Sequence, residues 1–355
     1  MNNKYIEFLK IITYRVSYIL KTLKKLPKLN DESKEIIIWA PEFWHYRYLV
    51  GDNFIQDMGV LNSLQNNGYD VTVYTKKDIG KFFGKTIFIH GERSRNPYSL
   101  FDYTKLQYMT MKQLEVQQNK VFITSEEFLY WENKEYMYKQ LQKFGVRIPE
   151  THIYKLDEIP FEQISYPILI KEEHSASSKG VFKVSSESEL KNIIETKRYK
   201  DENEYLITQQ LLNMRKDLRV ILVGGEIVLH YWRINLSDEW KPTSTGHGSD
   251  VDFVFFPEKW REWTVEQFKK IGITTGAFDI CWDNDDLESK PYILEVSPYY
   301  QPNPIPPSEL KELNISYGEW KKSFNLKVNY HKHHIDNFFR IKDIYIKQLI
   351  KDRKI

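Results

Sequence analysis

Short apolar runs alternate with segments of helical spacing over residues 34–130. The runs are rich in β-branched and aromatic residues, which is typical of strands buried in a parallel sheet. Between them, apolar residues recur every three or four positions, as on one face of an amphipathic helix. The pattern predicts strands at 35–40, 71–74, 86–90 and 121–124, and helices at 53–67 and 99–117. This alternation predicts an open, mostly parallel α/β domain over 31–130.

The pattern changes after residue 131, where strand-like runs follow one another with few helices between them. Gly224-Gly225 joins two of these runs, and paired glycines are a strong signal for a two-residue hairpin turn. The predicted strands are 151–154, 167–171, 181–184, 205–212, 218–223, 226–231, 276–282 and 292–296, and the helices are 132–144, 187–195 and 257–271. These elements predict an α+β domain over 131–325, with a smaller lobe at about 150–212.

Both ends of the chain combine apolar helical spacing with many basic residues. One helix is predicted within 1–30, ending at Pro27, and another within 326–355. The formal charge is +6 over 1–30 and +5 over 327–355, which leaves −9 for the rest of the chain. The apolar face of the first helix comprises Ile6, Leu9, Val16, Leu20 and Leu23.

These basic ends suit an anionic membrane surface or polymer. Two alternatives stay open: the basic positions are solvated helix faces, or the first helix packs against the C-terminal helix. His331, His333 and His334 are expected to belong to the basic C-terminal face rather than to a zinc site, because no cysteine accompanies them.

Composition narrows the class of protein. The chain has 355 residues, 41% of them hydrophobic and 15% aromatic, which fits two or three packed domains and excludes a disordered chain. A single cysteine, Cys281, excludes an intramolecular disulfide framework. No apolar run approaches the roughly 20 residues that span a bilayer, and the N-terminus lacks the layout of a secretory signal. We therefore expect a cytoplasmic protein, at most at the inner face of the membrane, with no nucleic acid partner.

Two carboxylates interrupt apolar strand runs in the second domain. Asp279 lies in the run AFDI and Glu295 in the run YILEV, on strands expected to be neighbours. Burying two like charges side by side is costly unless a cation accompanies them. Mg²⁺ takes carboxylate and phosphate oxygens together. The pair therefore favours a magnesium site, although each acid alone would also fit an ordinary edge position.

A lysine and a loop of small residues precede these carboxylates. Lys171 ends a predicted strand, and the loop HSASSKG follows at 174–180. Hydroxyls, backbone N–H groups and a lysine together can bind a triphosphate. Taken singly, such a loop is more often a plain hairpin, and such a lysine a solvated strand end. In this order, the residues indicate ATP chemistry with metal-stabilised phosphoryl transfer.

A series of short motifs follows in order over about 130–305. They are Asn133-Lys134, PILIK ending at Lys171, the loop at 175–180, QQLL at 209–212, Asp217-Leu218-Arg219 with its Gly-Gly hairpin, Phe278-Asp279, and LEVSP at 294–298. The series resembles the ATP-grasp superfamily, which includes D-alanine–D-alanine ligase, glutathione synthetase and the ribosomal-protein glutamate ligases. The resemblance implies a two-lobed ATP-grasp fold after a Rossmann-like pre-ATP-grasp domain, with ATP and Mg²⁺ as cofactors.

The resemblance also implies roles for individual residues. The phosphate-binding lysines correspond to Lys134 and Lys171, and the loop closing over the phosphates to Ser175, Ser177, Ser178, Lys179 and Gly180. The adenine-contacting hinge corresponds to Gln209, Gln210, Leu211 and Leu212, and the ribose-contacting acid to Asp217. A catalytic arginine corresponds to Arg219, and the metal-ligand positions to Asp279, Glu295 and Ser297.

Three positions depart from the family pattern. Ser297 replaces a usual metal-binding Asn, Gln209 replaces an acid common at the hinge, and Ala277 replaces an arginine that orients the acyl phosphate in many ligases. The basic residues expected to take over this last role are Arg233, Lys241 and His247.

The function implied by the resemblance is ATP-dependent ligation. A carboxylate would become an acyl phosphate, which a small-molecule amine attacks to form an amide. A cell-envelope glycan bearing a carboxylate is one expected acceptor. Two alternatives stay open: a degenerate nucleotide-binding protein recruited to a membrane or polymer, and an ATP-grasp kinase.

Overall fold

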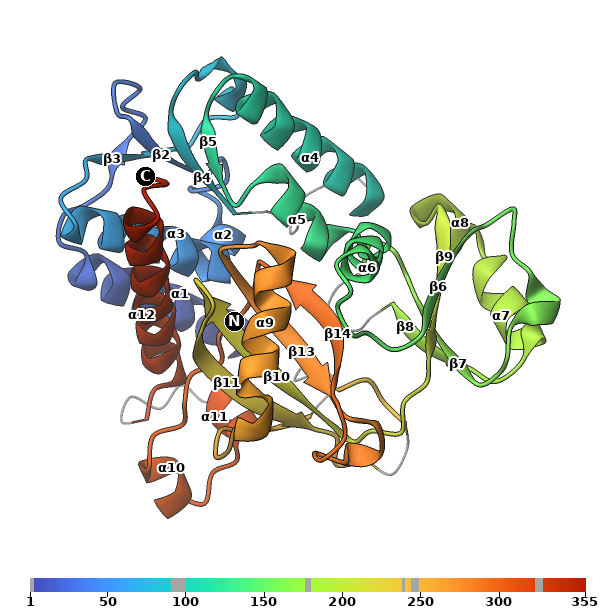
Figure 1. Cartoon of the computed structure of the whole chain (residues 1–355). Helices are drawn as coiled ribbons and strands as arrows, with labels where there is room; N and C mark the ends of the chain where they lie inside the picture. The colour runs from blue at the N-terminus through green and yellow to red at the C-terminus, as the bar shows by residue number, and fades with distance from the viewer. Residues whose placement is uncertain (1–2, 91–99, 176–179, 238–239, 244–248, 323–327) are drawn as a thin grey trace. The chain divides into compact units, whose positions relative to one another are not determined.

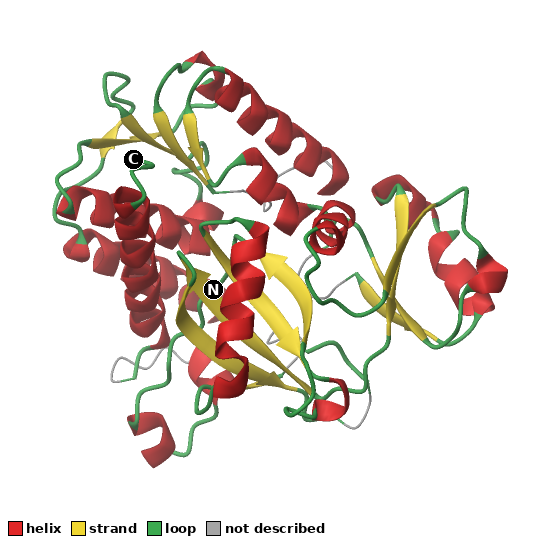
Figure 2. Ribbon diagram, in the orientation of Figure 1, coloured by secondary structure: helices red, strands yellow, loops and turns green. Residues whose placement is uncertain are grey.

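The computed structural model describes all residues except 1–2, 91–99, 176–179, 238–239, 244–248 and 323–327. The chain forms two compact units, which Figures 1 and 2 show as ribbons. The first comprises Met1–Arg95, Met109–Ser125 and Gln301–Ile355, and the second Asn96–Tyr108 and Glu126–Tyr300. The C-terminal segment is thus grouped with the N-terminal α/β residues.

The first unit contains a five-stranded parallel sheet in the order β1-β3-β2-β4-β5. Its strands are β1 (Lys28–Leu29), β2 (Ile36–Trp39), β3 (Val71–Tyr74), β4 (Thr86–Ile89) and β5 (Lys120–Phe122). The associated helices are α2 (Tyr46–Val50), α3 (Asp52–Asn66) and α4 (Leu100–Val116), the last of which continues into the second unit. The parallel α/β architecture expected from the apolar runs is confirmed.

The terminal helices α1 (Asn3–Thr22) and α12 (Tyr330–Lys351) contact each other, and α12 also packs along α3. Tyr18 on α1 donates a hydrogen bond to Asp336 on α12 at 2.7 Å. The packing of the N-terminal helix against the C-terminal one is therefore confirmed. The expected docking face is wrong in part, because Ile6, Leu9 and Leu20 are exposed whereas Arg15 and Ile19 are buried. Two short helices, α10 (Glu309–Glu312) and α11 (Tyr317–Lys322), precede α12. No described helix has the length and apolar character needed to cross a bilayer.

The expectation that the histidines form part of a basic surface is wrong for two of the three. His331 and His334 are buried, and burial lowers the pKa of each to about 4. Arg15 of α1 donates a hydrogen bond to His331 at 3.3 Å. The neutral His331 ring therefore links α12 to α1.

The second unit contains a four-stranded antiparallel sheet in the order β6-β9-β7-β8. Its strands are β6 (Thr151–Lys155), β7 (Ile168–Lys171), β8 (Val181–Val184) and β9 (Tyr205–Gln210). Helices α7 (Glu187–Ile194) and α8 (Lys197–Glu202) pack through Leu190, Ile194 and Tyr199 against Ile168, Ile170 and Leu206. Because side chains alternate along a strand, Lys171 points to the opposite face from this core.

The same unit contains a five-stranded antiparallel sheet in the order β12-β11-β10-β13-β14. Its strands are β10 (Lys216–Val223), β11 (Glu226–Ile234), β12 (Asp250–Asp252), β13 (Thr275–Cys281) and β14 (Tyr292–Ser297). Helix α9 (Arg261–Ile271) covers one face through Phe268 and Ile271, which pack against Val220 and Phe278. Helices α5 (Ser125–Glu132) and α6 (Lys134–Lys143) precede the two sheets. The predicted Gly-Gly hairpin is confirmed, since Val223 pairs with Glu226.

Candidate active site

Strand pairing in the five-stranded sheet gathers charged residues on the face opposite α9. Asp217 pairs with Arg233 across β10 and β11, and Arg219 pairs with Asp279 across β10 and β13. Asp279 in turn pairs with Glu295 across β13 and β14. Opposite residues in an antiparallel pair share a face, so these five side chains form one polar surface. The predicted adjacency of Asp279 and Glu295 is confirmed.

Asp279 is bound by two arginines, Arg219 and Arg233. Arg219 donates from Nε to Oδ1 at 2.7 Å and from Nη2 to Oδ2 at 2.8 Å, while Nη2 of Arg233 lies 2.8 Å from Oδ2. Arg233 also forms a bidentate pair with Asp217, in which its Nε donates to Oδ1 at 2.8 Å. Asp217, the predicted ribose-contacting acid, is 1% exposed and is held inside the sheet surface by this pair.

The arginines explain how Asp279 remains charged inside the protein. Burial acts to raise the pKa of Asp279, but Arg219 and Arg233 outweigh it and hold that pKa below the usual range for a carboxyl. A cation was expected beside the buried acids, and at Asp279 these two arginines of the chain itself supply the positive charge. A metal ion is therefore not required to keep the buried Asp279 carboxylate charged.

Glu295 differs from Asp279 in having no such partner. Among the described residues, no hydrogen bond or ion pair reaches its half-buried carboxylate. The Ser297 hydroxyl is buried and donates to the carbonyl of Tyr299. In the described part of the chain, no three His, Cys, Asp or Glu side chains converge as a metal site. Two carboxylates still fit Mg²⁺, because this ion keeps water and phosphate oxygens as its other ligands.

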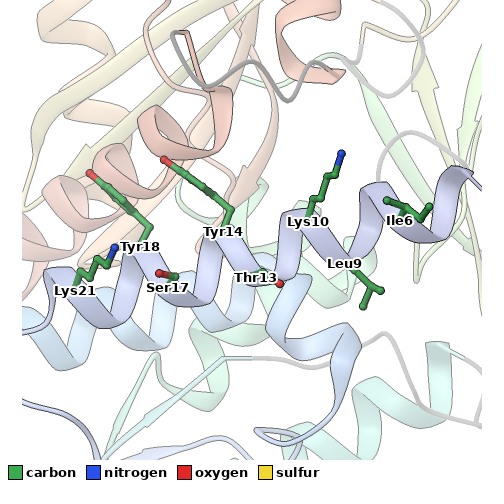
Figure 3. A pocket seen from close by; sticks show the side chains of 8 residues that line it. All are labelled: Ile6, Leu9, Lys10, Thr13, Tyr14, Ser17, Tyr18 and Lys21. Carbon is green, nitrogen blue, oxygen red and sulfur yellow. The ribbon is translucent and has the colours of Figure 1, made fainter.

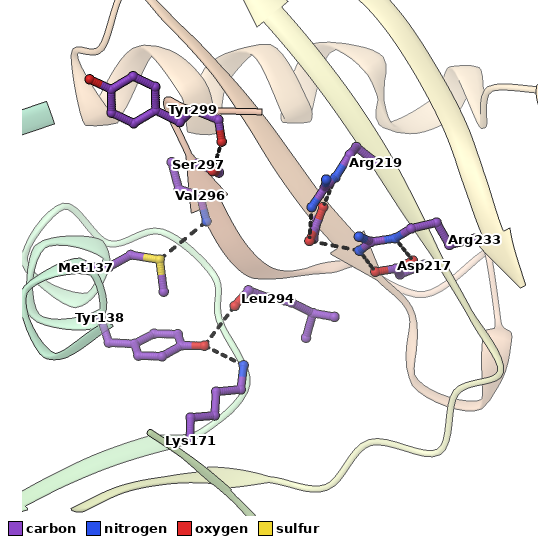
Figure 4. A network of polar contacts seen from close by, with 11 residues as sticks. Met137, Tyr138, Lys171, Asp217, Arg219, Arg233, Leu294, Val296, Ser297 and Tyr299 are labelled. Atoms are coloured by element: carbon purple, nitrogen blue, oxygen red, sulfur yellow. Dashed lines mark hydrogen bonds and ion pairs between the residues drawn. The ribbon is translucent and has the colours of Figure 1, made fainter. Parts of the chain in front are cut away.

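Lys171 reaches the same surface from the four-stranded sheet. It is 7% exposed and donates a hydrogen bond at 2.5 Å to the hydroxyl of Tyr138, which donates to the carbonyl of Leu294 at 2.8 Å (Figure 4). This chain of contacts connects Lys171 to the residue before Glu295. Burial lowers the pKa of Lys171 to about 8, although Glu295 and Asp279 act in the opposite direction. Lys171 is thus a buried strand-end residue and not a solvated one.

Tyr138 is a residue of the candidate site that was not predicted from the sequence. Its position carried a signal, since it lies four residues after Lys134 and such residues share a helix face. In the structure both belong to α6, whose Asn133 side chain caps the helix by accepting from the backbone N–H of Tyr136. Burial raises the pKa of Tyr138 well above its usual value, so the hydroxyl stays neutral.

Lys134 lies at the start of the candidate phosphate loop. Its ammonium is buried and donates to the carbonyl and hydroxyl oxygens of Ser175. A Cβ on Gly180, at the other end of the loop, would approach Ser175 and Glu172 to 2.6 Å, so a glycine is needed there. Ser177, Ser178 and Lys179 lie outside the described residues, so their phosphate role stays a prediction.

The candidate hinge follows β9. Gln209 is 1% exposed and donates from Nε2 to the Thr151 hydroxyl at 2.9 Å. The backbone N–H of Gln210 donates to the carbonyl of Glu150, Leu212 is buried and Leu211 is half-buried. These positions connect the two sheets of the unit along the chain, and their contact with adenine stays a prediction.

The basic residues expected to orient an acyl phosphate occupy different settings. Arg233 belongs to the buried pair with Asp217, whereas Lys241 is exposed, with its carbonyl accepting from Asn235 at 3.3 Å. His247 lies outside the described residues. Of these residues and Arg219, the two arginines are therefore the ones that the structure brings together at Asp279.

Known proteins share both sequence and fold with this chain. Residues 141–240 match the family described as D-ala D-ala ligase C-terminus. The alpha-aminoadipate–LysW ligase LysX of Sulfurisphaera tokodaii is 27% identical over 181 residues, covering 49% of this chain and 61% of that protein. The D-alanine–D-alanine ligase of Clostridium botulinum is 26% identical over 182 residues, covering 48% and 59%. The chain thus spans about three fifths of the length of these relatives.

Solved structures extend the likeness over most of the chain. A RimK domain ATP-grasp protein from Sphaerobacter thermophilus superposes with a TM-score of 0.52 at 12% identity, covering 85% of this chain and 98% of that one. A D-alanine–D-alanine ligase from Bacillus anthracis in complex with ATP gives the same TM-score and identity, covering 90% and 99%. The chain is thus similar in sequence to ATP-dependent ligases over about half of its length, and it shares the two-lobed ATP-grasp fold with the solved structures.

Proposed function

We propose that the chain is an ATP- and Mg²⁺-dependent ligase that joins a carboxylate to an amine. The proposal depends mainly on the cross-strand pair Asp279–Glu295, which Lys171 approaches through Tyr138 and Leu294. A cation and two carboxylates on one surface suit a metal-bound triphosphate, and the relatives named above are ligases. The glycan acceptor expected from the sequence stays a prediction.

The proposed reaction has two steps. A carboxylate oxygen attacks the γ-phosphorus of ATP and ADP leaves with the bonding electron pair, giving an acyl phosphate. The amine nitrogen then attacks the acyl carbon, phosphate leaves, and the nitrogen loses a proton. Bound Mg²⁺ would neutralise charge on the phosphates, and Asp279 and Glu295 are the residues to hold it. Lys134 and Lys171 would hold the phosphate oxygens, and Arg219 and Arg233 supply positive charge beside the metal carboxylates.

An ADP-release screen across carboxylates and amines tests this proposal. A ligase should release ADP fully only when both substrates are present, and Glu295→Gln should abolish the release without unfolding the protein. Glu226→Gln on the exposed hairpin is the matched control and should behave as wild type. ADP release that never depends on an amine would indicate a kinase. Nucleotide binding without any turnover would indicate a degenerate binding protein.

A second candidate function is recruitment to an anionic membrane surface, and the exposed side of α1 favours it. A groove of about 530 Å³ runs along this side (Figure 3). Its described lining is Ile6, Leu9, Lys10, Thr13, Tyr14, Ser17, Tyr18 and Lys21. Apolar and tyrosine side chains between lysines suit the boundary of lipid headgroups, where each basic residue contributes about 1 kcal/mol.

Point variants can test recruitment without disturbing the buried side of α1, where Arg15, Ile19 and Leu23 are packed. Wild-type protein should co-sediment with vesicles of phosphatidylserine in phosphatidylcholine. Leu9→Glu combined with Lys10→Glu should abolish co-sedimentation, whereas Leu26→Glu, an exposed leucine outside the groove, should retain most of it. Wild-type protein that stays in the supernatant would rule recruitment out.

A further inference from the structure

Asp279 has no oxygen left unused by arginine. Arg219 bonds to both Oδ1 and Oδ2, at 2.7 and 2.8 Å, and Arg233 lies 2.8 Å from Oδ2. A divalent cation at 2.0–2.1 Å from one of these oxygens would meet a positively charged guanidinium at the same carboxylate. Metal binding at Asp279 therefore requires that an arginine moves away.

The two arginines are anchored differently. Arg233 makes its own bidentate pair with Asp217, so it keeps a carboxylate partner whatever happens at Asp279. Arg219 directs both donors of its fork to Asp279 itself. The side chain of Arg219 is also 19% exposed, against 9% for Arg233, which leaves it more room to turn. Arg219 is therefore the exchangeable partner.

The charges around Asp279 already balance. Asp217, Asp279 and Glu295 supply three negative charges, and three positive charges come from Arg219, Arg233 and Lys171. A free divalent cation would add two positive charges to a neutral surface, which is unfavourable where side chains are largely buried. A triphosphate carries the negative charge that would compensate for it.

We propose that Arg219 is a built-in counter-cation that keeps free divalent metal away from Asp279 until the nucleotide arrives. This inference rests on the proposed ATP site. It adds an order of binding, in which the metal binds together with the nucleotide and not before it. Arg219 then acts as a positioning residue: it fixes the Asp279 carboxylate in place while no metal is present.

Mn²⁺ binding, followed by the paramagnetic resonance signal of the free ion, tests the inference without any measurement of turnover. Full-length wild-type protein should bind Mn²⁺ with a non-hydrolysable ATP analogue and at least about tenfold more weakly without it, as expected when a charged group competes for one ligand. Arg219→Met should raise the nucleotide-free Mn²⁺ affinity by about tenfold or more. Arg219→Lys keeps the charge but loses the fork, and should give a smaller rise.

Two controls locate the effect. Adding Asp279→Asn to Arg219→Met should remove the gained affinity, because the gain acts through that carboxylate. Arg261→Met, at an exposed pair on α9, should leave Mn²⁺ binding unchanged. Circular dichroism of each variant checks folding, and Arg219→Lys serves if Arg219→Met does not fold.

The outcomes separate this inference from the proposed function. Equal Mn²⁺ affinity of wild type with and without nucleotide, or no gain in either Arg219 variant, would overturn the counter-cation role while leaving an ATP site intact. Absence of Mn²⁺ binding to wild type even with the nucleotide analogue would overturn the proposed function, and the counter-cation role with it.

Discussion

On the five-stranded sheet, the buried acids Asp217 and Asp279 face arginines, whereas on the four-stranded sheet the buried Lys171 donates to the neutral hydroxyl of Tyr138. The first arrangement satisfies each charge within the chain. The second leaves a cation that is desolvated without a direct ion pair, which is why its pKa falls to about 8. On the five-stranded sheet, Asp217 and Asp279 are therefore balanced by direct partners, whereas Lys171 on the four-stranded sheet has, among the described carboxylates, only the longer-range attraction of Glu295 and Asp279.

The difference reflects two ways of treating a buried charge. A buried carboxylate held by bidentate arginine recovers much of its desolvation cost, but removing one partner leaves an uncompensated charge. A buried lysine with a neutral partner recovers less of its desolvation cost. Its protonated form is stabilised most when a negatively charged ligand binds beside it. The first arrangement fixes the Asp279 carboxylate while no metal is present, and the second suits a ligand-binding group.

The largest expected effect comes from removing the carboxylate that the two arginines balance. Asp279→Asn should destabilise the protein by about 3–5 kcal/mol, because Arg219 and Arg233 then lose a buried counter-charge. Glu295→Gln should cost far less, because no ion pair is broken. Urea unfolding of both variants measures the difference. Equal destabilisation by the two substitutions would mean that the arginines do not stabilise Asp279.

Much of the second unit could be predicted from the sequence, because the local apolar pattern marks the strands and strands next to each other in sequence also pair in the sheet. Strands β8 and β14 and the hairpin between β10 and β11 were marked by apolar runs and paired glycines, and neighbouring strands then set Asp279 opposite Glu295. The arginine pairing was not predictable in the same way. Arg219 and Arg233 lie 60 and 46 positions from Asp279, and which face each occupies depends on the register of strands far apart in the sequence.

In the first unit, too, contacts between segments far apart in the sequence could not be predicted, here between two helices. Helical spacing predicts helices near both termini but leaves open whether the two helices pack against each other. The structure buries Arg15, His331 and His334, and the neutral His331 ring accepts a hydrogen bond from Arg15. Burial that neutralises histidine is a tertiary effect, and no local pattern reports it.

Glu173 follows β7 of the four-stranded sheet. Like Lys171 it is a buried ionisable residue, and among the described residues no Lys or Arg forms a direct ion pair with it. Its buried carboxylate accepts from Asn133 Nδ2 at 3.2 Å and from the backbone N–H of Glu204 at 3.0 Å, and burial raises its pKa to about 7. Because the folded-state pKa lies above the ordinary value of 4.5, stability should fall as pH rises from about 4.5 to 7, by about 3 kcal/mol in total. Thermal unfolding across this range should show that Glu173→Gln loses this part of the decline. An unchanged pH profile in the variant would assign the decline to other groups.

Removing the Lys171 ammonium should weaken nucleotide binding more than it lowers the stability of the fold. Lys171→Met should lower ATP affinity by about 10–100-fold, corresponding to about 1.5–3 kcal/mol for a hydrogen bond to a charged group. Stability should stay the same or rise, since a desolvated charge is removed. Calorimetry measures the affinity, with Lys155→Met at the exposed end of β6 as the matched control. Unchanged affinity in Lys171→Met would show that this lysine does not face the nucleotide.

The smallest expected effect is the pH dependence of the same contact. In the free protein Lys171 loses its proton above about pH 8, and a nucleotide binds better to the protonated form. ATP affinity should therefore be steady below pH 8 and fall by up to about tenfold per pH unit above it, so that wild type loses about tenfold between pH 7 and 9. Lys171→Arg keeps its charge throughout this range and should show a flat profile, while Lys171→Met should be flat and weak. If Lys171→Arg shows the same pH dependence of ATP affinity as wild type, the titrating group is not Lys171. Lys171 would then not be the group whose protonation controls nucleotide binding.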